Sequence, residues 1–350
     1  MRPPHTAKRG SFLTVQDAGE RALIARIAAL TGPAPDFLTI GIGDDAAVLD
    51  SPVREQVVLT CDAQVEGVHF RRDWTDAESI GRKAVAVNLS DLAAMGAAPH
   101  VILLSLCLPA SLTIEDFDAL AAGAIAEARG AGAVLAGGNI TRSSGPLVVD
   151  VTAMGRVHRR RVMTRAGARA GDELWVTGSV GAAAAGLAWL EAGRDRHESP
   201  EAAECVARFE RPAARIRLGR RVAGSRSATA AMDLSDGLAD AARQVAEASG
   251  CGVTLESDAI PVHPSAGLVL LALGRDPIAA ALSGGEDYEL LFAVPAKRRR
   301  AFQSAVSRAG GPEAVCVGRL TADRTQFELV TGAGREPLPA GFQHLVTSRI

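Results

Sequence analysis

Apolar residues in the first half of the chain form short β-branched runs that alternate with longer stretches of helical spacing. Short runs of this kind predict strands, whereas apolar residues that recur at helical intervals predict helices. Helical spacing covers residues 20–30 and 76–96 and begins again near Thr113. The predicted strands are DFLTIGIG at 36–43, EQVVLTCD at 55–62, VILLSLCL at 101–108, AVLAG at 133–137 and LVVDVTAMG at 147–155. The first half therefore predicts mixed α and β structure.

The alternation of strands and helices begins again after a basic, glycine-rich segment at residues 156–172. The predicted elements are a strand at 172–178, helices at 181–193 and 211–222, a strand that turns into a helix across 229–250, and strands at 252–256, 286–294, 313–318 and 325–330. We expect two α+β or α/β domains of comparable size. Their expected limits are a flexible tail at 1–18, an N-terminal domain at 19–157 and a C-terminal domain at 158–350.

The chain is long enough for two hydrophobic cores and carries almost no net charge. It has 350 residues, of which 47% are hydrophobic and 22% are charged, and its formal net charge is −2. A nucleic-acid-binding protein usually carries an excess of basic residues, which this chain does not have. No apolar run approaches the roughly 18 residues of a membrane span. We therefore expect no nucleic-acid partner and no membrane partner. Lysine occurs only at positions 8, 83 and 297, so lysine-based phosphate binding has few possible locations.

The cysteines suggest a reducing compartment. The five are widely spaced and contain no C-x-x-C pair, which argues against a disulfide framework or a zinc ribbon. The first ten residues are basic but lack the apolar stretch of a secretory signal. A cytoplasmic location is the simplest expectation.

Four acidic turns follow apolar strands or helices: GIGDDAA at 41–47, LTCDAQVEGVHF at 59–70, NLSDLAAMG at 88–96 and MDLSDGL at 232–238. Clustered aspartates repel one another unless hard cations lie between them, and a ligand set made only of oxygens favours Mg²⁺ over zinc. An alternative is that the Ser-Asp pairs in the last two turns simply cap helices. The aspartates concerned are Asp44, Asp45, Asp62, Asp91, Asp233 and Asp236.

Familiar nucleotide-binding motifs do not fit. GIGDDA matches G-x-G-x-x-A, but two aspartates oppose a pyrophosphate, and Pro52 follows before a crossover helix has room to form. The P-loop and the protein-kinase motifs are absent from the sequence. Two glycine-rich segments, at 136–145 and 282–290, are instead predicted as loops whose backbone N–H groups approach phosphate, with Arg142 or Arg165 in support. The alternative for each loop is a plain turn.

The motifs taken together resemble the thiamine-monophosphate kinase family, within the superfamily that includes aminoimidazole ribonucleotide synthetase and selenophosphate synthetase. The resemblance is carried, in this order, by GIGDDAAV, LTCDAQVEGVHF, KAVAVNLSDLAAMGA, GGNITR, MTRAGARAGD, MDLSDGL and SGGEDYEL. It implies a homodimer whose N-terminal domains pair through their strands, and a second α/β domain behind the active-site cleft. The implied reaction transfers a phosphoryl group from ATP directly to thiamine phosphate with several Mg²⁺ ions, giving thiamine diphosphate and ADP.

The resemblance also implies roles for individual residues. Asp91, Asp45 and Asp62 would be catalytic, and the metal ligands would be Asp45, Thr60, Cys61, Asp62, Asp91, Asn139, Asp233 and Asp236. ATP would be bound by Gly138, Asn139, Arg165 and Ser235. Thiamine phosphate would be bound by His69, Glu286 and Phe342. Asn139 departs from the aspartate common in the family, so one Mg²⁺ should bind weakly or be absent.

The interpretation of three positions stays open. Lys83 is expected to be a solvated helix residue rather than a phosphate ligand, and His69 also suits a surface loop. For Phe342 core packing is favoured over a contact with substrate rings.

The implied reaction is consistent with the absence of the protein-kinase motifs from the sequence. A phosphate monoester is mostly ionised at pH 7, so the acceptor needs no general base. The rivals are a selenophosphate-synthetase-like or aminoimidazole-type enzyme, a hydrogenase-maturation dehydratase, which would end in a cysteine, and a nucleotide-binding regulator without activity. A selenophosphate synthetase would need a reactive cysteine near the N-terminus, but the first cysteine here is Cys61. The last residue is Ile350, which does not fit the dehydratase.

Overall fold

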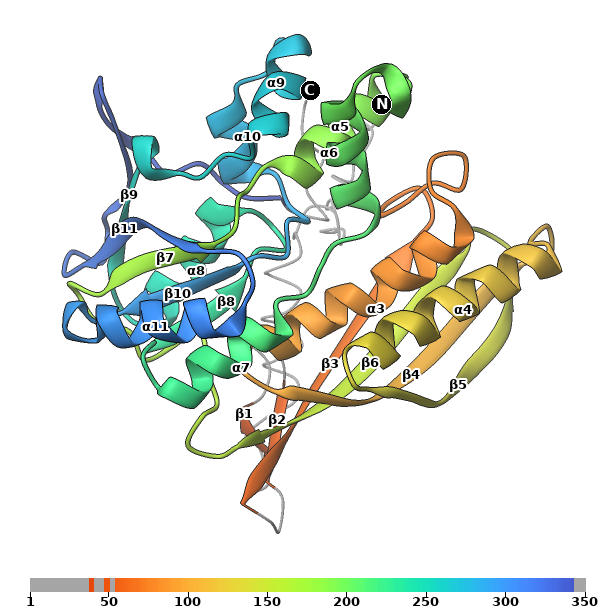
Figure 1. Cartoon of the computed structure of the whole chain (residues 1–350), viewed down its shortest axis with the longest axis horizontal. Helices are drawn as coiled ribbons and strands as arrows, with labels where there is room; N and C mark the ends of the chain where they lie inside the picture. The colour runs from red at the N-terminus through yellow and green to blue at the C-terminus, as the bar shows by residue number, and fades with distance from the viewer. Residues whose placement is uncertain (1–37, 41–46, 51–53, 343–350) are drawn as a thin grey trace, which may run out of the picture. The chain divides into compact units, whose positions relative to one another are not determined.

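A computed structural model describes residues 38–40, 47–50 and 54–342. These residues form two β-sheets with associated helices (Figure 1). The predicted mixed fold with two domains is confirmed. The predicted helix at 20–30 and the GDD turn with Asp44 and Asp45 lie outside the described residues.

The first sheet has six strands in the order β1-β2-β3-β6-β4-β5. Its longest pairing joins β3 and β6 in antiparallel register from Glu55 opposite His158 to Val65 opposite Val148. Helices α3 and α4 pack on one face of this sheet (Figure 1). The bounds are β1 Leu38–Ile40, β2 Ala47–Asp50, β3 Glu55–Val65, α3 Ala77–Ala94, β4 Ala98–Pro109, α4 Ile114–Gly130, β5 Val134–Ser143 and β6 Val148–His158.

The second sheet has seven strands in the order β13-β12-β9-β11-β7-β10-β8. Alternate residues of a strand face opposite sides, so Leu174 and Val176 enter one core and Trp175 enters another. The strands are β7 Glu173–Thr177, β8 Ala230–Asp233, β9 Gly252–Glu256, β10 Leu290–Val294, β11 Ala314–Thr321, β12 Phe327–Thr331 and β13 Gly334–Pro337. The helices are α5 Ala182–Glu191, α6 Pro200–Glu210, α7 Ile216–Ser225, α8 Leu238–Ala248, α9 Pro264–Ala272, α10 Pro277–Ser283 and α11 Arg299–Ala309.

Helix α3 is packed on several sides because its sequence is rich in small residues. A Cβ at Gly81 would lie 2.0 Å from the Leu120 carbonyl oxygen of α4. A Cβ at Gly219 of α7 would likewise lie 2.0 Å from the carbonyl oxygen of Ala93. Real Cβ atoms do not approach backbone so closely, so glycine is what permits these contacts. They hold α3 between α4 and α7.

Three predicted elements differ from the structure. The glycine-rich segment 136–145 was expected to be a loop, but β5 continues through it to Ser143. The helix expected from Arg211 begins at Ile216. The strand expected from Glu286 begins at Leu290, and the segment before it has irregular backbone.

Within the described ranges no single helix is long and apolar enough to cross a membrane. Helices α9 and α10 meet the length and composition test only as a pair, and that pair is bent by 114°.

Candidate active site

Two neighbouring residues near the end of α3 connect the two sheets. The hydroxyl of Thr60, on β3, donates a hydrogen bond to Oδ2 of Asp91. The hydroxyl of Ser90 donates to Oδ2 of Asp233, on β8, over 2.6 Å, and both of these side chains are buried. The NLSD and MDLSD motifs therefore meet where α3 contacts both sheets.

The helix-capping interpretation of the Ser-Asp pairs is wrong. Ser90 and Asp91 lie within α3, far from its first turn. The N-cap position of α8 is occupied by Gly237, so no side chain caps this helix. The Ser235 hydroxyl instead donates to Asp236 over 3.1 Å. These polar groups are therefore not accounted for by helix capping.

Strand β3 presents alternate side chains to opposite faces. Thr60 is buried against α3, and Asp62, two positions along, lies on the same face because the side-chain period of a strand is two. Cys61 lies on the other face, where its thiol donates to Oδ1 of Asp150 over 3.2 Å. Partial burial and the carboxylate of Asp150 raise the pKa of the Cys61 thiol. The Cys61 thiol is therefore directed away from the face that holds Thr60.

The turn DLSDG and the loop SGGEDYE interlock. The backbone N–H of Glu286 donates to the carbonyl oxygen of Ser235 over 2.7 Å, and a Cβ at Gly285 would lie only 2.2 Å from that same oxygen. Glu286 and Tyr288 adopt positive φ values of 68° and 48°, which side chains larger than glycine rarely adopt. Such strain persists only where surrounding contacts impose it, and it is concentrated at functional sites.

The pKa of the chain's single tyrosine reflects its burial and the negative charge of the surrounding carboxylates. Tyr288 is only 6% exposed. Burial, together with the negative charges of nearby carboxylates, holds the pKa of Tyr288 well above its usual range. These carboxylates belong to Glu286, Asp62, Asp233 and Asp236. An acidic residue of the first sheet thus lies near three from the second domain, as the motifs predicted.

Lys83 is buried, and the expectation of a solvated helix residue is wrong. Its side chain is 1% exposed, and Nζ donates to Oε2 of Glu286 over 2.8 Å and to the carbonyl oxygen of His69 over 3.1 Å. The same Nζ lies 3.8 Å from the centre of the Phe209 ring, in a cation–π contact. Lys83 therefore brings together the two segments that carry His69 and Glu286. The available signals were its position two turns before Ser90 and the scarcity of lysine.

His69 and Phe342 lie at the margins of this cluster. The backbone N–H of Val65 donates to Nδ1 of His69 over 3.0 Å, which fixes the orientation of a partly buried ring. Phe342 is 51% exposed, and its backbone N–H donates to the carbonyl oxygen of Asp236 over 3.1 Å. The core-packing interpretation of Phe342 is therefore wrong.

The predicted ATP-binding residues lie farther from one another than the residues around Asp91 do. Nη1 of Arg165 donates to Gln244 of α8 over 2.6 Å. Gly138 and Asn139 are exposed on β5, and two strands separate β5 from β3. At about 4.8 Å between neighbouring strands, Asn139 lies roughly 14 Å from the β3 backbone. One copy of the chain does not bring Asn139 beside Thr60 and Asp62.

The donors gathered here have the chemistry of a site for a hard cation. They are hydroxyl and carboxylate oxygens, which suit Mg²⁺. In the part of the chain that the structure describes, no group of three or more His, Cys, Asp and Glu side chains is arranged to hold a metal ion. Asp45, the remaining predicted ligand of this group, lies outside that part.

The sequence and the fold were compared with those of known proteins. The family described as AIR synthase related protein matches with its N-terminal domain at residues 43–157 and its C-terminal domain at 169–330. The thiamine-monophosphate kinase of Salmonella typhimurium is 36% identical over 334 residues, which cover 94% of this chain and 99% of that protein. The chain belongs to the thiamine-monophosphate kinase family.

Two further members of the thiamine-monophosphate kinase family extend the likeness. The Escherichia coli K12 protein is 37% identical, with 87% of this chain and 91% of that protein covered. The solved structure of AaThiL complexed with AMPPCP and TMP superposes with a TM-score of 0.84 at 30% identity, covering 96% of this chain and all of that one. The chain therefore shares the fold of the family over most of its residues.

Proposed function

We propose that this protein transfers the γ-phosphoryl group of ATP to thiamine monophosphate, giving thiamine diphosphate and ADP. The observation that carries the proposal is the meeting of NLSD and MDLSD, where Ser90 bonds Asp233 and its neighbour Asp91 bonds Thr60. We infer the reaction from family membership, because the relatives that align over most of this chain are thiamine-monophosphate kinases. AMPPCP and TMP bound to AaThiL support ATP and thiamine monophosphate as the substrates.

Charge neutralisation is the main requirement of this reaction. A phosphate dianion must approach a triphosphate, and two unit charges about 4 Å apart repel by about 4 kcal/mol at an effective dielectric of 20. The acceptor is already ionised near pH 7 and needs no general base. Bound Mg²⁺ would neutralise phosphoryl oxygens and align the attacking and leaving atoms. We propose that Asp62, Asp91, Asp233 and Asp236 hold it, with Asp45 and the oxygens of Thr60 and Cys61.

The substrates would be positioned by the groups around this cluster. We propose that His69 and Glu286, held together by Lys83, bind thiamine monophosphate. Phe342, half exposed beside the DLSDG turn, offers a ring for the thiamine rings to stack on. Gly138, Asn139, Arg165 and Ser235 are proposed to bind ATP.

We also propose that two copies of the chain associate. The face of the first sheet opposite α3 and α4 exposes Leu103 by 45% and Val134 by 61%. Partly exposed Leu59 and Met154 lie in register with each other on the same face. An apolar sheet face of this kind suits a self-complementary interface. A cytoplasmic location is supported by five free thiols.

A product assay tests the proposed reaction. The purified protein is incubated with ATP, thiamine monophosphate and MgCl₂, and thiamine diphosphate and ADP are quantified by chromatography. We expect the two products in equal amounts. Tight ATP binding with neither product would favour the regulator, and ADP without thiamine diphosphate would indicate a different acceptor.

A further inference from the structure

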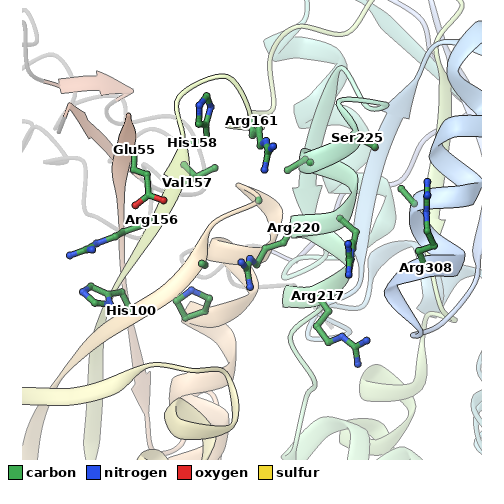
Figure 2. A pocket seen from close by; sticks show the side chains of 17 residues that line it. Glu55, His100, Arg156, Val157, His158, Arg161, Arg217, Arg220, Ser225 and Arg308 are labelled. Carbon is green, nitrogen blue, oxygen red and sulfur yellow. The ribbon is translucent and has the colours of Figure 1, made fainter. Parts of the chain in front are cut away.

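A large basic cavity lies apart from the residues assigned to the reaction. Its volume is about 880 Å³, within the range of small-molecule sites. None of the predicted site residues that the structure describes lines it. Figure 2 shows its walls, with His100, Arg156 and His158 from the first sheet on one side and Arg217 and Arg220 of α7 on the other. Six arginines of the described part of the chain line it: Arg156, Arg161, Arg217, Arg220, Arg221 and Arg308.

The arginines of α7 are directed to the cavity by the amphipathic pattern of that helix. Positions 217, 220 and 221 share one face because residues three and four apart are neighbours on a helix. The opposite face buries Leu218 and Val222 in the core. Contacts at Gly219 and Gly96 fasten α7 to α3, since a Cβ at Gly96 would lie 2.4 Å from that of Ala223. Close packing therefore holds this wall of the cavity against α3.

The positive charge of the cavity has little internal compensation. Among the described residues that line it, Glu55 is the one carboxylate. No salt bridge in the described part of the chain involves any of these six arginines. The whole chain has a net charge of −2, so this concentration of guanidinium groups is local. Gathering like charges is unfavourable unless an anion lies between them.

We propose that this cavity binds a small molecule that carries a chain of phosphoryl groups, at a site separate from the reaction proposed above. Guanidinium groups form paired hydrogen bonds with phosphate oxygens, which lysine does not match. Several guanidinium groups spread around 880 Å³ suit consecutive phosphoryl groups better than a single phosphate. A nucleoside diphosphate and inorganic polyphosphate share this chemistry.

Binding of inorganic tripolyphosphate tests the site without reference to catalysis. Titration calorimetry is performed in EDTA, so that metal-dependent binding at the acidic cluster is suppressed. The wild type should bind tripolyphosphate at least about tenfold more tightly than inorganic phosphate. The double variant Arg217→Ala, Arg220→Ala should lose at least about tenfold in affinity, because it removes the charge-assisted hydrogen bonds that two guanidinium groups would make to phosphate oxygens. ADP should compete with tripolyphosphate if the source is a nucleotide.

Two controls make the result specific. The double variant Arg275→Ala, Arg300→Ala removes the same charge from exposed positions outside the cavity and should bind within about twofold of wild type. Arg217→Lys with Arg220→Lys keeps the charge and should lose part of the affinity. Absence of binding, or an equal loss of affinity in both alanine doubles, would overturn the proposal.

Discussion

At the scale of single residues, the candidate site depends on contacts between positions far apart in the chain. Lys83 and Glu286 are 203 positions apart and still form an ion pair at 2.8 Å. The sequence predicted Glu286 and His69 from motifs, but it did not predict their link through Lys83. A helical lysine is usually solvated, and only the approach of SGGEDYE and Phe209 to α3 buries this one.

Replacing Lys83 with methionine tests this link. Methionine keeps the length and the packing on Phe209 but removes the charge, so Glu286 loses its partner. We expect a loss of about 2 kcal/mol in the free energy of unfolding, below the 3–5 kcal/mol of fully buried pairs because Glu286 is 20% exposed. Because the His69 carbonyl is also released, KM for thiamine monophosphate should rise at least about fivefold, with a smaller change in kcat.

The matched variant for Lys83→Met is Glu286→Gln. If the two residues act through each other, the double variant is less damaged than the sum of the single variants by about 1–2 kcal/mol in urea unfolding. Strict additivity would show that the ion pair does not couple them.

At the scale of elements, several glycines within helices and strands permit close approach of neighbouring backbone. Gly137 and Gly138 looked like part of a loop, yet they lie in β5, where a Cβ at Gly138 would be 1.8 Å from the Leu104 carbonyl oxygen. The sequence does not distinguish a glycine needed for a turn from one needed for contact with a neighbouring strand. Helix α8 was predicted well because it is an amphipathic segment with a clear end at Gly250, and α3 was predicted well because it is a long segment rich in alanine.

The contact between α7 and α3 allows a comparison within one helix. Gly219→Ala places a Cβ against the Ala93 carbonyl oxygen, whereas Gly224→Ala meets nothing within 4 Å. Both are helical, so alanine is intrinsically favoured by about 1 kcal/mol at either site. We expect Gly219→Ala to lower the free energy of unfolding by about 1–3 kcal/mol, and Gly224→Ala to leave it unchanged or raise it by up to 1 kcal/mol. Urea denaturation of both proteins measures the difference, and equal effects would refute the packing account.

At the scale of the whole molecule, the motifs predicted two domains and an acidic cluster, and the sequence did not predict where Asn139 lies. Its strand is the last in the order of the first sheet, because β6 and β4 intervene after β3. Strand order depends on long-range pairing, which local patterns do not encode. The open face of that sheet, which includes Leu103, is likewise visible only once the strands are arranged.

Self-association through this face is tested with Leu103→Glu. A charge at the centre of an apolar interface opposes association, so we expect the variant to sediment as a monomer where the wild type sediments as a dimer. Leu271→Glu, at an exposed leucine on α9, is the control and should leave the dimer intact. Wild-type protein that sediments as a monomer, or a Leu103→Glu dimer of unchanged affinity, would contradict the proposed interface.

The turnover of Asp91→Asn tests the central claim most directly, since Asp91 is proposed to hold Mg²⁺ at the meeting of the two motifs. Asparagine retains an oxygen for the Thr60 hydroxyl, so the fold should persist in thermal denaturation. Asp118→Asn, an exposed change on α4, is the matched control. We predict that thiamine diphosphate formation falls on the order of 1,000-fold, or about 4 kcal/mol, in Asp91→Asn and is unchanged in Asp118→Asn. Near-normal turnover in folded Asp91→Asn would contradict the account.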